Sequence, residues 1–320
     1  MTPRTFCFTL LSILAASIAA NLPAQAQRAR VFVSVTGNDA NPCTAGSPCK
    51  TFQTAYNAVL AGGEISVLDT GGYGTLTIAK ALSIVSPAGV EASIAIPSGG
   101  TGITISAGSS DKVSLRGLTL DGQGMAGFGI DFVSGQSLTV EDCIVRNMTI
   151  DGLDFFSFTS APQTLTVSNS YFTDNAGSGL VIKTVFTGAV TVSIDKTGFN
   201  GNVGNGLLVD GTSGMFGETI NVAVTDSVAA NNGIGFAVQS GNDHATGNLS
   251  LTHSLAAGNG IAGVLAEGSN AALWIAQSTA TGNGFGYDAL GGGVILSYGD
   301  NYLAAGNLSN NGVLGSATKQ

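Results

Sequence analysis

Two aspartates, Asp131 and Asp154, hold the same position in two similar short segments of the sequence. If those segments are neighbouring parallel strands, their backbones lie about 4.8 Å apart and the two carboxylates face each other directly. Paired carboxylates can bind Ca²⁺ or perform acid–base chemistry on a glycosidic bond. The competing interpretation is that both side chains point into water and repel only weakly. Asp121 and Asp151 are near in sequence and are candidates to join the pair.

Few other side chains are candidates for chemistry. Trp274 is the single tryptophan, and its predicted strand directs it outward, where an indole can stack on a sugar ring. His253 falls in a column of outward polar residues and His244 in a polar loop, so both are poor catalytic candidates. The sequence has no phosphate-cradling glycine loop, catalytic serine motif or zinc-ligand spacing.

The elements that position these residues are repeats. A glycine followed by an apolar residue, and by a second apolar residue two places on, recurs through the chain and predicts one strand per repeat. The repeats are Gly102-Ile103-Thr104-Ile105, Gly129-Ile130-Asp131-Phe132, Gly152-Leu153-Asp154-Phe155, Gly179-Leu180-Val181-Ile182, Gly206-Leu207-Leu208-Val209, Gly235-Phe236-Ala237-Val238, Gly263-Val264-Leu265-Ala266 and Gly293-Val294-Ile295-Leu296.

A second alternating strand follows in most repeats, for example Leu138-Thr139-Val140, and is followed by regular columns. A column of small residues includes Cys143, which we therefore interpret as a structural thiol. Asparagines recur eight places after the strand, and stacked amides can bond from coil to coil, so we expect a structural ladder rather than glycan attachment or ligand contact. The asparagines are Asn175, Asn202, Asn232, Asn259 and Asn283, with Asn147 one place early.

Units of about 27 residues with short strands and no helix cannot bury an apolar face alone, whereas stacked units can. We therefore expect an all-β fold, a single parallel β-helix of roughly 8–10 coils over residues 64–313, followed by a polar tail at 314–320. A β-propeller would need blades of about 40 residues with antiparallel hairpins. The amphipathic run from Thr51 to Leu60, ended by Gly62-Gly63, predicts a short helix that covers the N-terminal end. No helix is predicted at the C-terminal end, which is loosely capped or paired with a partner.

The first residues have the features of an export signal: Arg4, an apolar stretch, and Ala24-Gln25-Ala26 as a cleavage site. Residues 1–26 are therefore a predicted signal peptide, and the mature chain should begin near Gln27, secreted or periplasmic. The apolar stretch is shorter than the roughly 20 residues that span a membrane, so an anchor is the less favoured interpretation. No later segment is continuously apolar enough to span a bilayer.

The predicted N-terminal segment, residues 27–63, contains two cysteines in a short Pro/Gly-rich loop. Because export permits disulfides, we expect Cys43 and Cys49 to pair. A metal site is the alternative, but no second cysteine pair or histidine lies near.

The charge balance opposes nucleic-acid binding. The chain has 11 basic and 20 acidic residues, a net charge of −9, and loss of Arg4 with the signal peptide leaves 10 and 20, a net charge of −10. Such a surface repels a phosphate backbone, because that binding draws most of its affinity from Lys and Arg.

Beyond the acid pair, the same outward position of the repeat is apolar. These residues form either an exposed stripe suited to self-association or a surface beneath a loop, such as the insertion around Met215-Phe216. The residues are Val181, Leu208, Ala237, Leu265 and Ile295.

The chain resembles the bacterial secreted right-handed β-helix proteins of the pectin-lyase-like superfold. The resemblance covers nearly the whole mature chain and is carried by the leader from Val31 to Asp39, the short Cys loop, the segment Pro48-Cys49-Lys50-Thr51-Phe52 and the coils. It implies a right-handed β-helix and carbohydrate as the first substrate class. The paired-Asp and Gly-His-Gly segments of polygalacturonases are missing, as is the calcium–carboxylate set with a partnered Arg of pectate lyases. Those activities therefore do not carry over.

These observations favour a non-catalytic exported β-helix that binds polysaccharide or cell-envelope material. One alternative is a polysaccharide lyase or glycoside hydrolase with an atypical acidic site at Asp131 and Asp154. The other is a structural or self-assembling protein.

Overall fold

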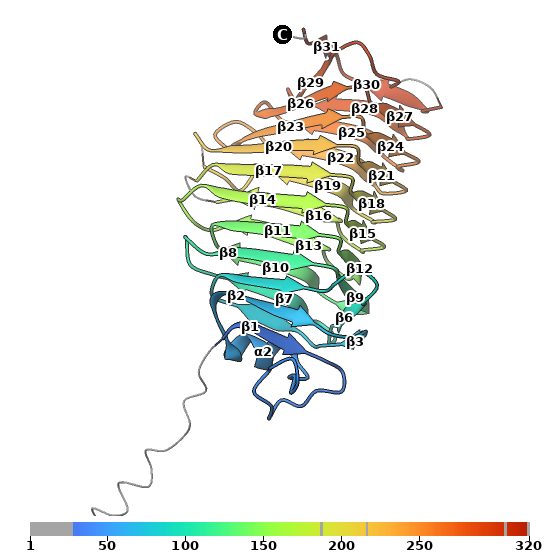
Figure 1. The fold of residues 1–320 in the computed structure, drawn as a ribbon. Coiled ribbons are helices and arrows are strands. Elements are labelled where there is room, and N and C mark those ends of the chain that lie inside the picture. The colour runs from blue at the N-terminus through green and yellow to red at the C-terminus, as the bar shows by residue number, and fades with distance from the viewer. Residues whose placement is uncertain (1–27, 186–187, 216, 304–305, 319–320) are drawn as a thin grey trace, which may run out of the picture.

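The computed structural model describes residues 28–185, 188–215, 217–303 and 306–318. These residues form a rod of stacked coils (Figure 1). Up to three short strands per coil fall into three sheets, which we call the twelve-, ten- and nine-stranded sheets. The predicted all-β parallel β-helix is thus confirmed, with about ten coils. The predicted signal peptide lies outside the described residues.

Each sheet collects one strand from successive coils, and neighbouring strands pair in parallel. The twelve-stranded sheet contains β1 (Arg28–Val33), β2 (Val59–Val67), β5 (Leu82–Val85), β8 (Lys112–Arg116), β11 (Ser137–Glu141), β14 (Gln163–Ser168), β17 (Val190–Asp195), β20 (Thr219–Thr225), β23 (Thr246–Thr252), β26 (Ala271–Ala276), β29 (Val294–Ser297) and β31 (Leu314–Ser316). The ten-stranded sheet contains β4 (Leu76–Ile78), β7 (Thr101–Ser106), β10 (Phe128–Ser134), β13 (Leu153–Ser157), β16 (Leu180–Thr184), β19 (Asn205–Asp210), β22 (Ile234–Gln239), β25 (Ala262–Glu267), β28 (Phe285–Leu290) and β30 (Ser309–Asn311). The nine-stranded sheet contains β3 (Gly71–Gly72), β6 (Ala92–Ala95), β9 (Leu118–Ala126), β12 (Ile144–Met148), β15 (Tyr171–Thr173), β18 (Gly198–Asn200), β21 (Val228–Ala230), β24 (Leu255–Ala257) and β27 (Thr279–Thr281).

The core is a set of apolar columns inside the coils. Alternate residues of each strand point inward, and the register places apolar residues of neighbouring coils side by side. For example, Leu138 pairs with Leu165, which pairs with Val192. Aromatic rings also stack between coils, with the centroids of Phe132 and Phe155 4.3 Å apart and their planes 5° from parallel. Each coil therefore completes the burial of the next, as expected for a repeat that cannot fold alone.

A buried asparagine ladder runs along the rod, as predicted. The side-chain amide of Asn232 donates to the Phe199 carbonyl (2.9 Å) and to Asn259 Oδ1 (3.1 Å), and its own Oδ1 accepts from the backbone and side chain of Asn202. The ladder also continues to Asn307, beyond the predicted column. Asn147 stays outside it, because Met148 occupies the corresponding position and donates its N–H to Asn175 Oδ1.

The glycine column and the asparagine ladder require each other. A Cβ on Gly206 would lie 2.6 Å from the Gly235 carbonyl oxygen and 3.1 Å from Asn232 Nδ2. The side-chain amide and the next peptide thus fill the space that any larger residue would need. This close approach explains why both residues recur at a fixed spacing.

Two further columns mark the turn after each strand of the twelve-stranded sheet. The column of small residues is a second ladder of hydrogen bonds between coils. The Cys143 N–H donates to Ser170 Oγ, and the Ser227 N–H donates to Ser254 Oγ. Cys143 is fully buried within it, in agreement with a structural role. The residue before each small residue, His253 among them, has a positive φ of 47–54°, so this outward polar column is a left-handed turn.

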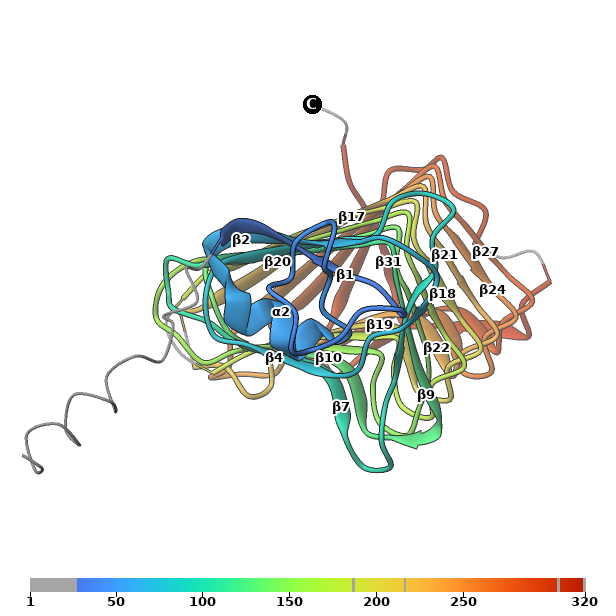
Figure 2. The same cartoon turned by 60° about the horizontal axis from the view of Figure 1, so that its bottom comes forward.

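The N-terminal end is closed by the α-helix α2 (Phe52–Ala58), which lies across the first coils (Figure 2). The Thr51 hydroxyl caps it by accepting from the Thr54 N–H (3.2 Å). The helix is shorter than the predicted run from Thr51 to Leu60, because β2 already begins at Val59. The predicted Cys43–Cys49 disulfide forms in the loop before this helix.

The β-helix extends beyond the predicted limits of 64 and 313. β1 already pairs with β2, and β31 pairs with β29, so both the N-terminal segment and the start of the predicted tail contribute strands.

One prediction about the ten-stranded sheet is wrong. The last repeat is Gly286-Tyr287-Asp288-Ala289 in β28, because the glycines at 291 and 292 form a turn with positive φ, and Ile295 points inward from β29. Of the two alternatives for the outward apolar column, burial of most of its members excludes the exposed stripe. Val181, Ala237 and Leu265 are each at most 3% exposed, so they offer no surface to a partner.

No helix among the described residues is long and apolar enough to cross a membrane.

Candidate functional site

The acid pair forms as predicted on the ten-stranded sheet. Asp131 of β10 and Asp154 of β13 are direct partners in the parallel register, with Val181 of β16 next in the column. The neighbouring outward position of β13 and β16 brings Phe156 beside Lys183. The register therefore places a lysine next to the two carboxylates.

Lys183 is the functional candidate that sequence reasoning missed. Its Nζ lies 3.5 Å from Asp154 Oδ2 and 5.8 Å from the centroid of the Phe156 ring. The ammonium thus supplies the positive charge that two facing carboxylates need. The available signal was its place two residues after Val181, on the same outward face one strand further along.

Asp154 is the most unusual residue of the site. It is only 7% exposed, and its Oδ1 is buried without a hydrogen-bond partner. Burial raises the pKa of Asp154 to about 6, a rise that Lys183 opposes and that Asp151 and Asp131 reinforce. A carboxyl with a raised pKa beside a lysine is a group that can exchange protons near neutral pH.

Of the other two predicted acids, Asp151 lies at the site and Asp121 does not. Asp151 accepts a hydrogen bond from the Ser178 N–H (2.6 Å) and acts electrostatically on Asp154, so it joins the site. Burial raises the pKa of both Asp151 and Asp131. Asp121 does not join, because it lies in β9 of the nine-stranded sheet, where it pairs with Arg146 at 2.9 Å.

The donor set is a poor fit to the predicted calcium ion. No three His, Cys, Asp or Glu side chains in the described part of the chain are arranged to hold a metal ion. Calcium takes six to eight oxygen ligands, whereas here one carboxylate oxygen already faces the Lys183 ammonium. We therefore derive no chemistry through a metal.

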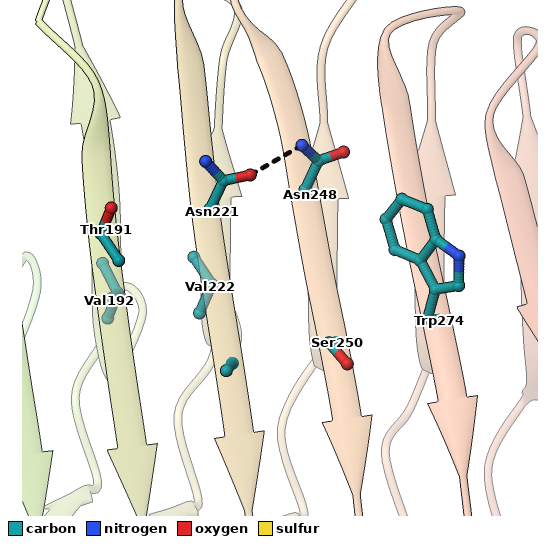
Figure 3. Close-up of a pocket in the computed structure, with 8 residues that line it drawn as sticks. Thr191, Val192, Asn221, Val222, Asn248, Ser250 and Trp274 are labelled. Atoms are coloured by element: carbon teal, nitrogen blue, oxygen red, sulfur yellow. Dashed lines mark hydrogen bonds between the residues drawn. The ribbon is translucent and has the colours of Figure 1, made fainter. Parts of the chain in front are cut away.

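The second candidate site is a shallow groove on the outer face of the twelve-stranded sheet (Figure 3). It encloses about 350 Å³ across β17, β20, β23 and β26. Asn248 donates its side-chain amide to Asn221 Oδ1 (2.9 Å), and the half-buried Trp274 lies on the next strand, in register with Ser250. The sheet thus presents a flat aromatic surface beside a row of small polar side chains.

The polar side chains of this groove are uncharged. Thr191, Asn221, Asn248 and Ser250 offer hydroxyl and amide groups that both donate and accept hydrogen bonds. The groove is also open along the sheet, since the strands that line it belong to four successive coils. These features suit an extended neutral ligand that is rich in hydroxyl groups.

The two histidines lie in a loop and in a turn. His244 Nδ1 lies 3.4 Å from the Gly214 carbonyl oxygen in a loop contact. His253 is one of the left-handed turn residues.

Comparison with known proteins shows the fold. A family model described as the right-handed beta helix region matches residues 81–216. The solved structure of pectate lyase Pel9A is similar with a TM-score of 0.62 at 16% identity, over 92% of this chain and 79% of that one. A rhamnogalacturonan lyase is similar with a TM-score of 0.52 at 12% identity, over 83% and 75%. No curated protein matches the sequence. The chain therefore has the right-handed parallel β-helix of the pectin-lyase-like fold.

Proposed function

We propose that this protein binds a neutral polysaccharide in the groove beside Trp274, without turning it over. The observation that carries the proposal is an indole set beside paired asparagine amides on an open sheet face. A sugar ring has apolar faces that stack on an indole and a rim of hydroxyls that bond to amides. The groove supplies both kinds of contact.

The proposed preference for a neutral chain rests on charge. The groove-lining residues carry no charge, and the whole chain has a net charge of −9. An acidic polysaccharide would meet repulsion from the whole molecule without a local cation to offset it. The solved structures of similar fold are named as lyases of polysaccharides, which supports glycan as the ligand class only by analogy of fold.

The test is retention of the protein on a panel of neutral and acidic polysaccharides in affinity gels. We expect retention by a neutral polysaccharide, weakened at least about tenfold by Trp274→Ala, which corresponds to about 1.4 kcal/mol. Tyr171→Ala is the matched control, because Tyr171 is an aromatic residue 51% exposed on the nine-stranded sheet. Equal retention of the two variants would contradict the proposal.

A second candidate function is a lyase or hydrolase that uses Asp131, Asp154 and Lys183. The observation that favours it is the buried Asp154 carboxyl with a raised pKa beside the Lys183 ammonium. The same panel decides between the two functions if unsaturated ends and reducing sugar are measured as well. Product release that Asp131→Ala and Asp154→Asn abolish would favour the enzyme, whereas retention without product favours the binder.

We also propose that the chain is exported, with residues 1–26 removed. The Cys43–Cys49 disulfide supports this, because such bonds persist in oxidising compartments. The intact mass of the protein recovered from a secreting host should correspond to a chain that begins near Gln27. A protein that keeps its first residues and stays in the cytoplasm would contradict export.

A further inference from the structure

The acid site on the ten-stranded sheet holds more negative charge than its own lysine balances. Asp131 and Asp154 are direct partners in the register, and Asp151 acts on Asp154 electrostatically. Lys183 is the one cation among the described residues that acts on these three carboxyls. Carboxylates that face each other repel, so a second positive charge would stabilise the site.

Several carboxylate oxygens of this site lack a hydrogen-bond donor. Asp131 accepts no hydrogen bond from the part of the chain that the structure describes. Asp154 Oδ1 is buried without a partner, in a side chain that is only 10% exposed. Because a buried acceptor without a donor is costly, these oxygens are suited to a ligand that brings N–H groups.

Lys183 shows which kind of group these surroundings accept. Its ammonium lies near a carboxylate and an aromatic ring, 3.5 Å from Asp154 Oδ2 and 5.8 Å from the centroid of the Phe156 ring. Phe158 packs against Phe156 with ring centroids 4.0 Å apart and is itself 43% exposed. Carboxylates and ring faces both attract ammonium groups. A ligand with a protonated amine would therefore meet the same two kinds of contact that hold Lys183.

The rod beyond the acid site carries charge of one sign. Residues 197–318 contain seven Asp and Glu residues but no Lys or Arg. The outward column of the ten-stranded sheet that contains Lys183 continues through Asp210 and Gln239 to Glu267, one residue per coil. Such a field attracts a polymer with several positive charges and repels an acidic one.

We propose that the acid site binds a protonated primary amine of an amino-sugar polysaccharide, a glycan whose amines are not acetylated. The ammonium donates to Asp131 and to Asp154 Oδ1, and its charge offsets that of the carboxylates. The exposed ring of Phe158 offers a face for the sugar that carries the amine, which favours a glycan over a basic peptide. The proposal names the ligand class of the second proposed function, rests on the same carboxylates, and does not require turnover.

The test is calorimetric titration with a short glucosamine oligosaccharide and with its fully N-acetylated counterpart, which lacks the positive charges. We expect the free-amine probe to bind. Asp131→Asn and Asp154→Asn should each weaken this binding roughly tenfold or more, the effect of losing a charged hydrogen bond. Any binding of the acetylated probe should be the same in these variants as in wild type. Lys183→Met should strengthen binding of the free-amine probe, because it removes a competing cation.

Asp226→Asn is the matched control. Asp226 is an exposed residue of the left-handed turn column with a φ of 47°, and Asn169 holds the same position of its coil with a φ of 48°. The substitution removes the same charge at a place that tolerates asparagine, so binding should stay unchanged. Circular dichroism confirms that each variant is folded. Equal weakening by Asp131→Asn and Asp226→Asn, or tighter binding of a lysine oligomer than of the glucosamine probe, would overturn the proposal.

The fluorescence of Trp274, the single tryptophan, separates the acid site from the groove. Binding that shifts the emission of Trp274 and that Asp131→Asn leaves intact would place the amine in the groove and overturn the proposal. Binding at the acid site without release of product would support the proposal and contradict only the enzyme. Failure of neutral polysaccharides to bind beside Trp274 would leave the result at the acid site unchanged.

Discussion

At the scale of single residues, Asp154 is a buried carboxyl in a position that penalises its charge. Burial raises the pKa of Asp154 more than Lys183 lowers it, so this pKa is about 6 instead of the usual 3.8. Residues that serve only the fold seldom hold a buried oxygen without a partner. These features of Asp154 support the second proposed function.

The raised pKa of Asp154 has a consequence for stability. Between about pH 4 and pH 6 the folded protein binds more protons than the unfolded chain, so the free energy of unfolding falls as pH rises through this window. The fall is on the order of 3 kcal/mol for a rise in pKa from 3.8 to about 6. Asp154→Asn should therefore melt at a higher temperature than wild type at neutral pH and show a weaker dependence on pH.

Lys183→Met is the opposing variant. Without the ammonium that holds the pKa of Asp154 down, that pKa should rise further and the protein should be less stable than wild type at neutral pH. Identical melting curves of wild type and Asp154→Asn across the pH range would contradict this view of the site. Calcium added to the same samples should raise the melting temperature of wild type no more than that of Asp154→Asn, because the donor set does not fit this ion.

At the scale of the elements, the ladders between coils decide which strands can stack. The side chain of Asn232 makes four hydrogen bonds inside the rod, two as donor and two as acceptor. Asn232→Ala would take away the oxygen that accepts from both the backbone N–H and the side-chain amide of the buried Asn202. Each buried donor that loses its acceptor costs about 1–3 kcal/mol, so we expect a loss of several kcal/mol in the free energy of unfolding.

The control for this variant is Asn221→Ala on the outer face, where one exposed side-chain bond to Asn248 is lost. Its effect should stay within about 0.5 kcal/mol. Denaturant unfolding of both proteins, followed by circular dichroism, measures the difference. Similar losses in the two variants would mean that the ladder is not what holds the coils together.

Most of the fold could be predicted from the sequence because the sequence consists largely of repeats. The inward columns, the asparagine ladder and the Asp131–Asp154 pair all follow from counting residues within a unit. The method failed where the unit changed length. A run of glycines near the C-terminal end imitated the repeat, and only the hydrogen-bond register identified Gly286 as the true member.

The candidate sites were less predictable, because they join residues from different columns. Lys183 reaches Asp154 from a neighbouring strand and a different outward position, which a single column does not show. The Trp274 groove likewise depends on four coils lying side by side. Burial of the apolar column around Val181 also depends on how neighbouring segments pack, which the alternation within one strand does not reveal.

At the scale of the whole molecule, the described residues form a rod with two distinct lateral sites. The acid site lies on the ten-stranded sheet and the groove on the twelve-stranded sheet, so one can be altered without touching the other. Binding and catalysis can therefore be tested independently in the same set of variants.

The central claim, that a polysaccharide chain lies against Trp274, has a direct measurement. Trp274 is the single tryptophan, so the tryptophan fluorescence of the protein reports on this position alone. Titration with the polysaccharide that retains the protein should shift the emission to shorter wavelength with the same affinity as calorimetry gives. Binding that calorimetry detects while the emission of Trp274 stays unchanged would contradict the claim.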